Sequence, residues 1–152
     1  MECIEVERIG MEGGLATLLN PHVIHLISAE ASRSAISIEI QIIGNLYTYL
    51  CTNAYNPQKL EEKLTMLRSL SNLQHRYPLA KMIYGGDFNM ITSLIEKKGG
   101  IKILNRDAEA FNNFIKTVKL VDIIPKSDAY TWNNKRGGDR KIASRLDRFF
   151  VT

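Results

Sequence analysis

Cysteine is scarce in this sequence, with Cys3 and Cys51 the only two in 152 residues. Two cysteines that far apart form neither a disulfide framework nor a zinc site, so both are expected to be reduced thiols of an intracellular protein. The first ten residues carry Glu2, Glu5 and Glu7 where a secretory signal has a basic flank and an apolar run, so no signal peptide is expected. No apolar stretch reaches the roughly 18 residues that a membrane span requires. These absences argue against disulfide-rich, zinc-binding and membrane-spanning proteins.

Length and charge set broad limits on the class of protein. At 17.2 kDa and 45% hydrophobic residues, the chain has the size of one ordinary globular domain. Residues 1–152 are therefore expected to form one domain or a large part of one, and no repeat or linker divides them. Twenty Lys and Arg against 16 Asp and Glu give a formal net charge of +4. This excess favours a polyanionic partner, although a basic solvated surface gives the same number.

The most regular pattern is the strict alternation of apolar and polar residues over Ile36–Ile42, which predicts a strand with four isoleucines on one face. Gly44-Asn45 tolerates a positive φ, and a β-branched and aromatic pattern resumes over 46–52. The two runs therefore predict a hairpin. A loop is expected over 53–57, because proline fixes its own φ and biases the residue before it away from helix.

Two helices are predicted from leucines and aromatic residues at spacings of three and four. The first covers about 60–77, and the second about 108–119 with Asn105 or Asp107 as its N-cap. Between them, the apolar run Leu79–Tyr84 predicts a buried strand that ends at two glycines.

Two further strands, over 129–133 and 141–151, are predicted on either side of the polar turn 135–140. The charged segment Glu96–Gly100 is expected to be a surface loop. Strand pairs interleaved with helices predict an α/β sandwich of sheet and helix layers.

The clearest chemical signal is Gly85-Gly86-Asp87-Phe88-Asn89. In an extended segment, Asp87 and Asn89 point to one side and Phe88 to the other. A carboxylate there is a hard ligand for Mg²⁺ or a base that orients water, and an asparagine amide donates to a phosphate oxygen. The glycines are expected to leave room for a phosphodiester. The same residue types also form ordinary turns.

Histidine and tryptophan are interpreted as structural residues. His22 and His25 are spaced by three, but no third ligand accompanies them, so surface or packing positions are expected. Trp132 has the chemistry to stack on a base, yet an aromatic residue in a strand is more often part of the core, where we expect it.

Three segments, in this order, resemble the motifs of the endonuclease/exonuclease/phosphatase superfamily: Asn53-Ala54-Tyr55-Asn56-Pro57, Gly86-Asp87-Phe88-Asn89 and Ser144-Arg145-Leu146-Asp147-Arg148-Phe149. Further segments are similar to the endonucleases of LINE-type (non-LTR) retrotransposons, especially those of plants: 13–16, 104–112, 120–122 and 130–134. The resemblance extends over essentially the whole chain. It implies a partial α/β sandwich of the DNase I-like type.

The resemblance also implies a role for each matching residue. Asp87 would activate or position the attacking water and contribute to a Mg²⁺ site, and Asn89 would contact the scissile phosphate. Tyr55 would lie beside that phosphate, and Asp147 would support the hydrogen-bond network. Phosphate contacts to DNA would come from the hairpin and its neighbourhood, from Lys135, Arg136, Arg140, Lys141 and Arg145.

The chain also departs from the family pattern. A complete domain has a glutamate, the principal metal ligand, on a strand that would precede Met1, and a Ser-Asp-His segment that would follow Thr152. Glu2, Glu5 and Glu7 match the wrong positions to replace that glutamate. The chain is therefore expected to lack N-terminal strands and a C-terminal strand and to have little or no activity by itself. An unpaired sheet edge and uncovered apolar surface would favour self-association, with candidates Ile36, Ile38, Ile40 and Ile42.

Three functional hypotheses follow. The chain is part of a Mg²⁺-dependent DNA endonuclease, nuclear if functional and without a small-molecule cofactor. Alternatively, it is a remnant that binds DNA weakly and catalyses nothing, or a member of the same superfamily that acts on a phosphorylated lipid or sugar. The segments 104–111 and 131–134 argue against the last of these.

Overall fold

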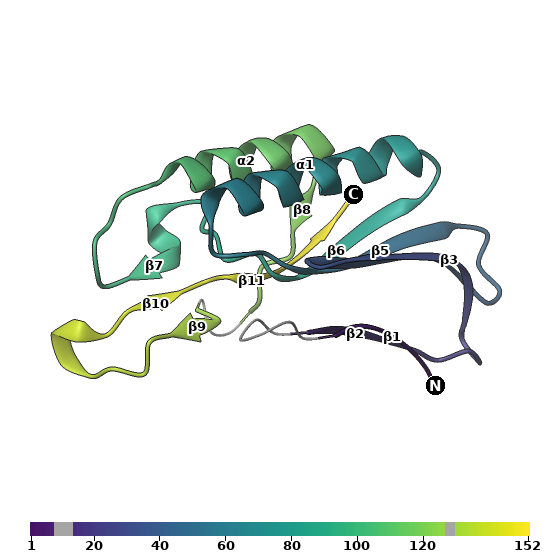
Figure 1. Cartoon of the computed structure of the whole chain (residues 1–152), viewed down its shortest axis with the longest axis horizontal. Coiled ribbons are helices and arrows are strands. Elements are labelled where there is room, and N and C mark those ends of the chain that lie inside the picture. Colours follow the sequence, from purple (N-terminus) through teal and green to yellow (C-terminus); the bar gives the residue numbers. More distant parts are fainter. Residues whose placement is uncertain (8–13, 127–129) are drawn as a thin grey trace.

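The computed structural model describes residues 1–7, 14–126 and 130–152. Gly13 and Ala129, each the first residue of a segment named above, lie outside these ranges. Within them the elements form layers, with helices over one face of a central sheet and a β-hairpin under part of the other (Figure 1). The sheet has the strand order β3-β4-β5-β6-β11-β8. The bounds of these strands are Ile24–Ser32, Ala35–Ile42, Thr48–Tyr55, Lys81–Asp87, Asp147–Val151 and Val121–Asp122. The predicted α/β sandwich is confirmed.

The predicted hairpin is formed by β4 and β5, which pair antiparallel through a turn with Gly44 at φ 85°. The second strand extends further than predicted, because residues 53–55 belong to β5 and not to a loop. The reason is the neighbouring strand: β5 pairs in parallel with β6, and this pairing continues to Tyr55 and Asp87. Long-range ladder bonds therefore overrode the local effect of Pro57.

Both predicted helices are present, α1 over Leu60–Arg76 and α2 over Arg106–Val118. Asn105 occupies the N-cap position of α2, although its side chain makes no capping bond. Neither helix in the described part of the chain is long and apolar enough to cross a membrane.

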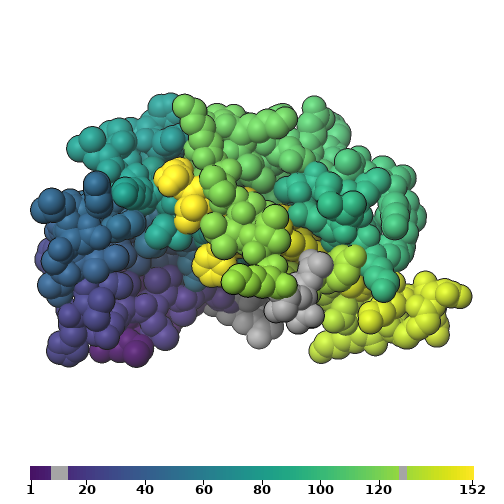
Figure 2. Space-filling model, turned by 180° about the vertical axis from the view of Figure 1, so that it is seen from behind, coloured from purple at the N-terminus to yellow at the C-terminus, as the bar shows by residue number. Residues whose placement is uncertain are grey.

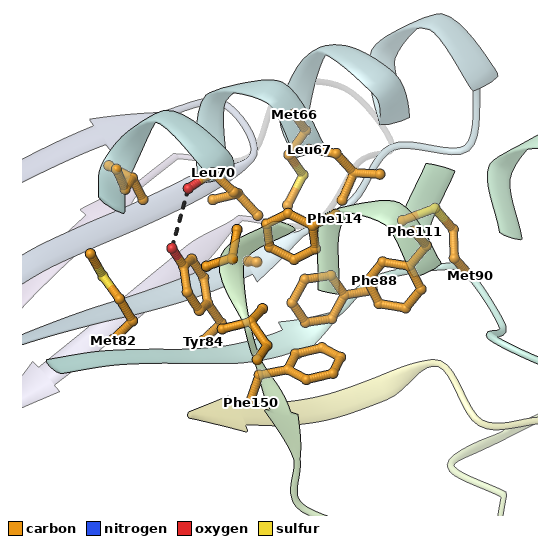
Figure 3. Packing of buried hydrophobic residues seen from close by; sticks show 14 of the residues in the cluster. Met66, Leu67, Leu70, Met82, Tyr84, Phe88, Met90, Phe111, Phe114 and Phe150 are labelled. Atoms are coloured by element: carbon orange, nitrogen blue, oxygen red, sulfur yellow. Dashed lines mark hydrogen bonds between the residues drawn. The ribbon is translucent and has the colours of Figure 1, made fainter. Parts of the chain in front are cut away.

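The main core lies between the helices and the sheet (Figure 3). Aromatic rings from three elements meet there: Phe88 stacks on Phe111 at a centroid distance of 5.3 Å and meets Phe150 edge-on at 5.4 Å. The Tyr84 hydroxyl, which is buried, donates to the Leu70 carbonyl at 3.2 Å. Burial raises the pKa of Tyr84 to about 12. The segment after β6 is thus anchored by Phe88 in the densest part of the core.

The opposite face of the sheet is covered at β4 by the antiparallel hairpin of β1 (Glu2–Val6) and β2 (Leu15–Leu19). Leu15 and Leu19 form a second core with the β4 isoleucines, and Ile36, Ile38 and Ile40 are 0%, 2% and 6% exposed. The expectation that these three isoleucines are uncovered was therefore wrong. Ile42, at the end of the strand, is 37% exposed.

A small sheet, which includes β7 (Lys97–Lys98), β10 (Ala143–Ser144) and β9 (Trp132–Asn133), lies beside the central one. The predicted strand over 141–151 is divided at Arg145 and Leu146, because β10 pairs within this small sheet and β11 joins the central sheet. Trp132 is 45% exposed at the sheet edge, so the prediction that it belongs to the core was wrong.

A cluster of buried ion pairs joins these parts. The Arg148 guanidinium is fully buried and donates to Asp122 Oδ2 at 2.8 Å and to both carboxylate oxygens of Glu96. Arg145 donates to Asp122 Oδ1 at 2.6 Å and pairs with Glu96 at 3.4 Å. Glu96 ends the 3₁₀ turn Leu94–Glu96, so the charged segment 96–100 is not wholly a surface loop. The cluster connects this turn, β8 and β11.

The ionisation of Glu96 reflects this surrounding. Burial opposes its charge, but hydrogen bonds from Arg148 and from the Thr92 amide outweigh burial, so its pKa lies below the ordinary value of 4.5. A depressed carboxyl pKa contributes stability that is present above the ordinary value and is lost as the pH falls through the folded value.

We predict that Glu96→Gln lowers the free energy of unfolding at pH 7 by about 3 kcal/mol, because it leaves buried guanidinium groups short of negative charge. The difference from wild type should shrink as the pH falls below 4.5, where Glu96 becomes protonated. Urea denaturation between pH 3 and pH 7 measures both effects. The exposed Glu7→Gln is the control, and equal losses in the two variants would contradict the prediction.

Candidate functional site

Three predicted site residues occupy one row across the central sheet. Strand pairing places Asp87 opposite Tyr55 on the β5 side and opposite Asp147 on the β11 side. Tyr84 and Phe150 face the helices. Each lies three residues from Asp87 or Asp147 on the same strand, and side chains alternate between the faces of a sheet, so the row faces away from the helix layer. The sheet thereby brings together residues that are far apart in the sequence.

The two glycines lie inside β6, which continues to Asp87, and do not end the strand as predicted. At Gly86, with φ 135°, a Cβ atom would come within 1.9 Å of the Ala54 carbonyl oxygen. At Gly85 it would meet the Phe149 ring at 2.7 Å. The glycines make room for β5 and for Phe149, and the expectation that they also leave room for a phosphodiester stays a prediction.

Asn89 is placed by hydrogen bonds and not by strand alternation. Its φ is 50°, in the left-handed region, and its amide N–H donates to Asp87 Oδ1 at 2.9 Å. Its side-chain Nδ2 donates to the Asn56 carbonyl at 2.6 Å, and its Oδ1 accepts from Gln58 Nε2 at 3.0 Å. Phe88 points into the core, as predicted. Asp87 and Asn89 are joined directly.

Sequence reasoning missed Asn56 and Gln58, the two amides on either side of Pro57. Asn56 is fully buried, and its backbone N–H donates to the Asp87 carbonyl at 2.8 Å. Its Nδ2 donates to the Phe88 carbonyl at 2.9 Å. The segment after β5 therefore holds the segment after β6. The signal for Asn56 was its place in the motif 53–57, where only Tyr55 was assigned a role.

Lys63 and Thr131 were also missed. Lys63 Nζ donates to the Asn89 carbonyl at 2.8 Å. Thr131 Oγ1 accepts from the backbone N–H groups of Leu146 and Asp147, both at 3.0 Å, and so fixes the start of β11.

The surroundings of Asp87 shift its ionisation. Burial raises its pKa above the ordinary value of 3.8, and the nearby carboxylate of Asp147 raises it further. The Asn89 amide and the charge of Lys63 act in the opposite direction without cancelling the rise. A carboxyl group with a raised pKa in a partly buried row is typical of a functional position.

The row has donors that suit a hard divalent cation. Mg²⁺ usually keeps several waters and binds through one or two carboxylates together with substrate phosphates. Asp87 and Asp147 provide two adjacent carboxylates, which fits this pattern. Within the described ranges, no group of three or more His, Cys, Asp and Glu side chains is placed to hold a metal ion. His22 and His25 are exposed, as expected.

The predicted basic hairpin follows β9 and projects from one end of the molecule (Figure 2). Its turn is held by Asn134, whose Oδ1 accepts from the N–H groups of Arg136 and Ile142. Four of the predicted DNA-contacting residues are exposed on it: Lys135, Arg136, Arg140 and Lys141. Arg145 is removed from this set, because it is 6% exposed and its guanidinium is bonded to Asp122 and Glu96.

Solved structures share the fold of this chain. The endonuclease domain of TRAS1, a telomere-specific non-LTR retrotransposon, matches with a TM-score of 0.72 and 16% sequence identity, over 99% of this chain and 66% of that domain. An endonuclease/exonuclease/phosphatase family protein from Bacteroides thetaiotaomicron matches with a TM-score of 0.67 and 14% identity, over 99% and 60% of the two chains. This chain has the endonuclease/exonuclease/phosphatase fold.

The same fold is found in TDP2 of D. rerio complexed with a single-strand DNA product, at a TM-score of 0.62 and 13% identity, over 98% of this chain and 60% of that one. The chain thus spans between 60% and 66% of the lengths of these three proteins. No family model matches the sequence, and no curated protein does so either. At these identities the likeness establishes the endonuclease/exonuclease/phosphatase fold alone.

We predict that Gly86→Ala destabilises the protein by about 3 kcal/mol, because the new Cβ would both clash with the Ala54 carbonyl and sit at an unfavourable φ. Urea denaturation measures the loss. Gly137→Ala is the matched control, since nothing lies within 4 Å of its Cβ position, and it should change stability by less than about 0.5 kcal/mol. Equal stability of the two variants would show that β5 does not approach β6 this closely.

Proposed function

We propose that this chain carries part of the catalytic site of a metal-dependent DNA endonuclease of the non-LTR retrotransposon type. The observation that carries the proposal is the row of Tyr55, Asp87 and Asp147, with Asn89 hydrogen-bonded to its middle residue, Asp87. The fold supports it, because the TRAS1 structure is described as an endonuclease domain. We further propose that residues 1–152 form one domain of such an enzyme and that it acts in the nucleus.

In this proposal Asp87 and Asp147 hold a Mg²⁺ ion. When bound, such an ion neutralises charge on a phosphodiester and promotes attack by water. Asp87 would also position the attacking water. Its pKa is raised by burial and by the like charge of Asp147, and a bound cation would offset both effects.

Asn89 and Tyr55 are proposed to hold the phosphate. An asparagine amide carries two N–H donors, and one of them is engaged by the Asn56 carbonyl. The second is available to a phosphate oxygen. The Tyr55 side chain, half-buried beside Asp87, would border the same phosphate.

DNA is proposed to lie along the hairpin with Lys135, Arg136, Arg140 and Lys141. These are four exposed cations in one turn, and phosphate contacts of this kind supply most sequence-independent affinity. Trp132, exposed at the base of the hairpin, adds an aromatic surface for a base.

One observation favours a second candidate function, a protein that binds DNA without cleaving it. Within the described residues no third His, Cys, Asp or Glu side chain joins the two carboxylates of the row, so less negative charge is available to hold a cation at the phosphate. We therefore propose slow hydrolysis by the chain itself, and the alternative is a protein that binds DNA without cleaving it.

The nicking of supercoiled plasmid in Mg²⁺ tests the proposal. The chain should convert supercoiled to open-circular DNA slowly, and Asp87→Ala should lower the rate by at least about 100-fold. The role of Asn89 is tested with Asn89→Asp instead of Asn89→Ala, because aspartate also tolerates the left-handed backbone at this position.

The Asp87→Ala protein, purified in the same way, controls for contaminating nucleases, and addition of EDTA controls for metal dependence. Nicking that Asp87→Ala leaves unchanged would sink the proposed site. Plasmid binding without any nicking by the wild-type chain would favour the non-catalytic candidate.

The hairpin is tested separately by the salt dependence of DNA binding. Replacing Lys135 and Arg136 by alanine should make the slope of log K against log salt shallower by about 2, close to one unit for each lost phosphate contact. Fluorescence anisotropy with a labelled duplex measures the slope. Alanine at Arg68 and Lys116, which are exposed on the helices, should leave it unchanged, and an equal change in both double variants would refute a hairpin-specific surface.

A further inference from the structure

Lys63 lies on the buried face of α1. Met66, Leu67 and Leu70, at spacings of three, four and seven from it, are all core residues, and Lys63 itself is 6% exposed. Lysine is almost never buried to this extent unless its charge is paired. A cation in a row of apolar residues therefore indicates a specific partner.

The partners come from two other elements. Lys63 Nζ donates to the Asn89 carbonyl at 2.8 Å and to Asp107 Oδ2 at 2.9 Å. Asp107 lies in the first turn of α2, where the helix dipole favours a negative charge. One ammonium group thus connects both helices with the segment that follows β6.

The conformation of Asn89 depends on hydrogen bonds, whereas its neighbours are held by packing in the core. Phe88 and Met90, on either side of it, point into the core beneath the helices (Figure 3). The left-handed backbone of Asn89 directs its own side chain elsewhere, toward Asn56 and Gln58. A left-handed conformation is unfavourable for a residue other than glycine unless its surroundings fix it.

Each polar atom of Asn89 has one of these partners. The backbone N–H is held by Asp87, the side chain by Asn56 and Gln58, and the carbonyl oxygen by Lys63. Lys63 is the one contact among them that comes from the helix layer. Without it, the carbonyl would lose a charged donor at a half-buried position.

We propose that Lys63, oriented by Asp107, is a positioning residue that fixes the backbone of Asn89 and so aims its amide at the phosphate. The role of the amide rests on the proposed function, whereas the control of Asn89 by Lys63 does not. The alternative is a pair that only joins α1 to α2. The two predict different behaviour at Asn89.

The first experiment follows the amide resonances of the full chain by NMR without metal or DNA. Lys63→Met keeps the apolar stem and removes the ammonium group. The backbone and side-chain N–H signals of Asn89 should shift or broaden, while those of β4 stay in place. Arg68→Met is the control, since Arg68 is exposed on the same helix and, among the described residues, bonds to Leu64 and Thr65 of its own helix.

Asp107→Asn provides a second variant that retains a hydrogen-bond acceptor. Within the described residues Asp107 accepts hydrogen bonds from Lys63 and from the Ala108 N–H and not from Asn89, so a shift of the Asn89 signals in this variant would be transmitted through Lys63. The double variant should show no further change at Asn89 beyond Lys63→Met, because both substitutions act through one contact. Unchanged Asn89 signals in folded Lys63→Met, or in Asp107→Asn if Lys63→Met does not fold, would overturn the proposal.

The second experiment measures plasmid nicking in Mg²⁺. Lys63→Met should lower kcat by about 100-fold and leave KM for DNA within about twofold, as expected when a group is misplaced by about 1 Å. Lys63→Arg restores the cation and should recover about tenfold of the loss. A parallel loss in kcat and in the amount of folded protein would overturn the positioning role. Absence of nicking by the wild-type chain would count against the proposed function, while the NMR result would still decide the role of Lys63.

Discussion

The parallel pairing of β5 with β6 is the constraint on which the site depends. It is the one parallel contact of the central sheet in the described part of the chain, and it ends with Tyr55 beside Asp87. The pairing needs a glycine at position 86, because any side chain there would enter the Ala54 carbonyl. Once it is formed, the segments that leave the two strands run side by side, and Asn56 can bond to the backbone of Asp87 and Phe88. The geometry of the site is therefore a direct result of how two strands end.

Strand β11 completes the row and shows how one strand serves both faces of a sheet. Asp147 faces the site, and the next residue, Arg148, is fully buried on the opposite face over the ring of Phe111. Its partner Asp122 belongs to the short edge strand β8, and its partner Glu96 belongs to the 3₁₀ turn outside the central sheet. Removing charge from this cluster is expected to loosen β11, and with it the position of Asp147.

The sequence predicted β4, both helices and the motif residues, whereas β1, β2 and β3 were not predicted and the contacts between elements could not be predicted. Alternation identified β4, and helical spacing identified α1 and α2, because these patterns report burial directly. The end of β5, the glycines inside β6 and the burial of the β4 isoleucines all depended on partners distant in sequence. Likewise, the motifs identified Asp87, Asp147 and Tyr55. Lys63 was missed because its helix was predicted from the spacing of its leucines alone.

The pairing of the buried charges has an electrostatic consequence for the order of binding. Arg145 and Arg148 are paired with Glu96 and Asp122, and Lys63 is paired with Asp107. The charge of Lys63 also acts on Asp87, but it does not cancel the rise of the Asp87 pKa. The row is therefore a negative centre, and the exposed positive charge of the hairpin lies elsewhere on the surface. In the proposed function, DNA attracted by the hairpin would meet repulsion at the row until a cation is bound there. Divalent cation and nucleic acid are thus expected to raise each other's affinity, a thermodynamic coupling that originates in which charges the fold neutralises and which it leaves exposed.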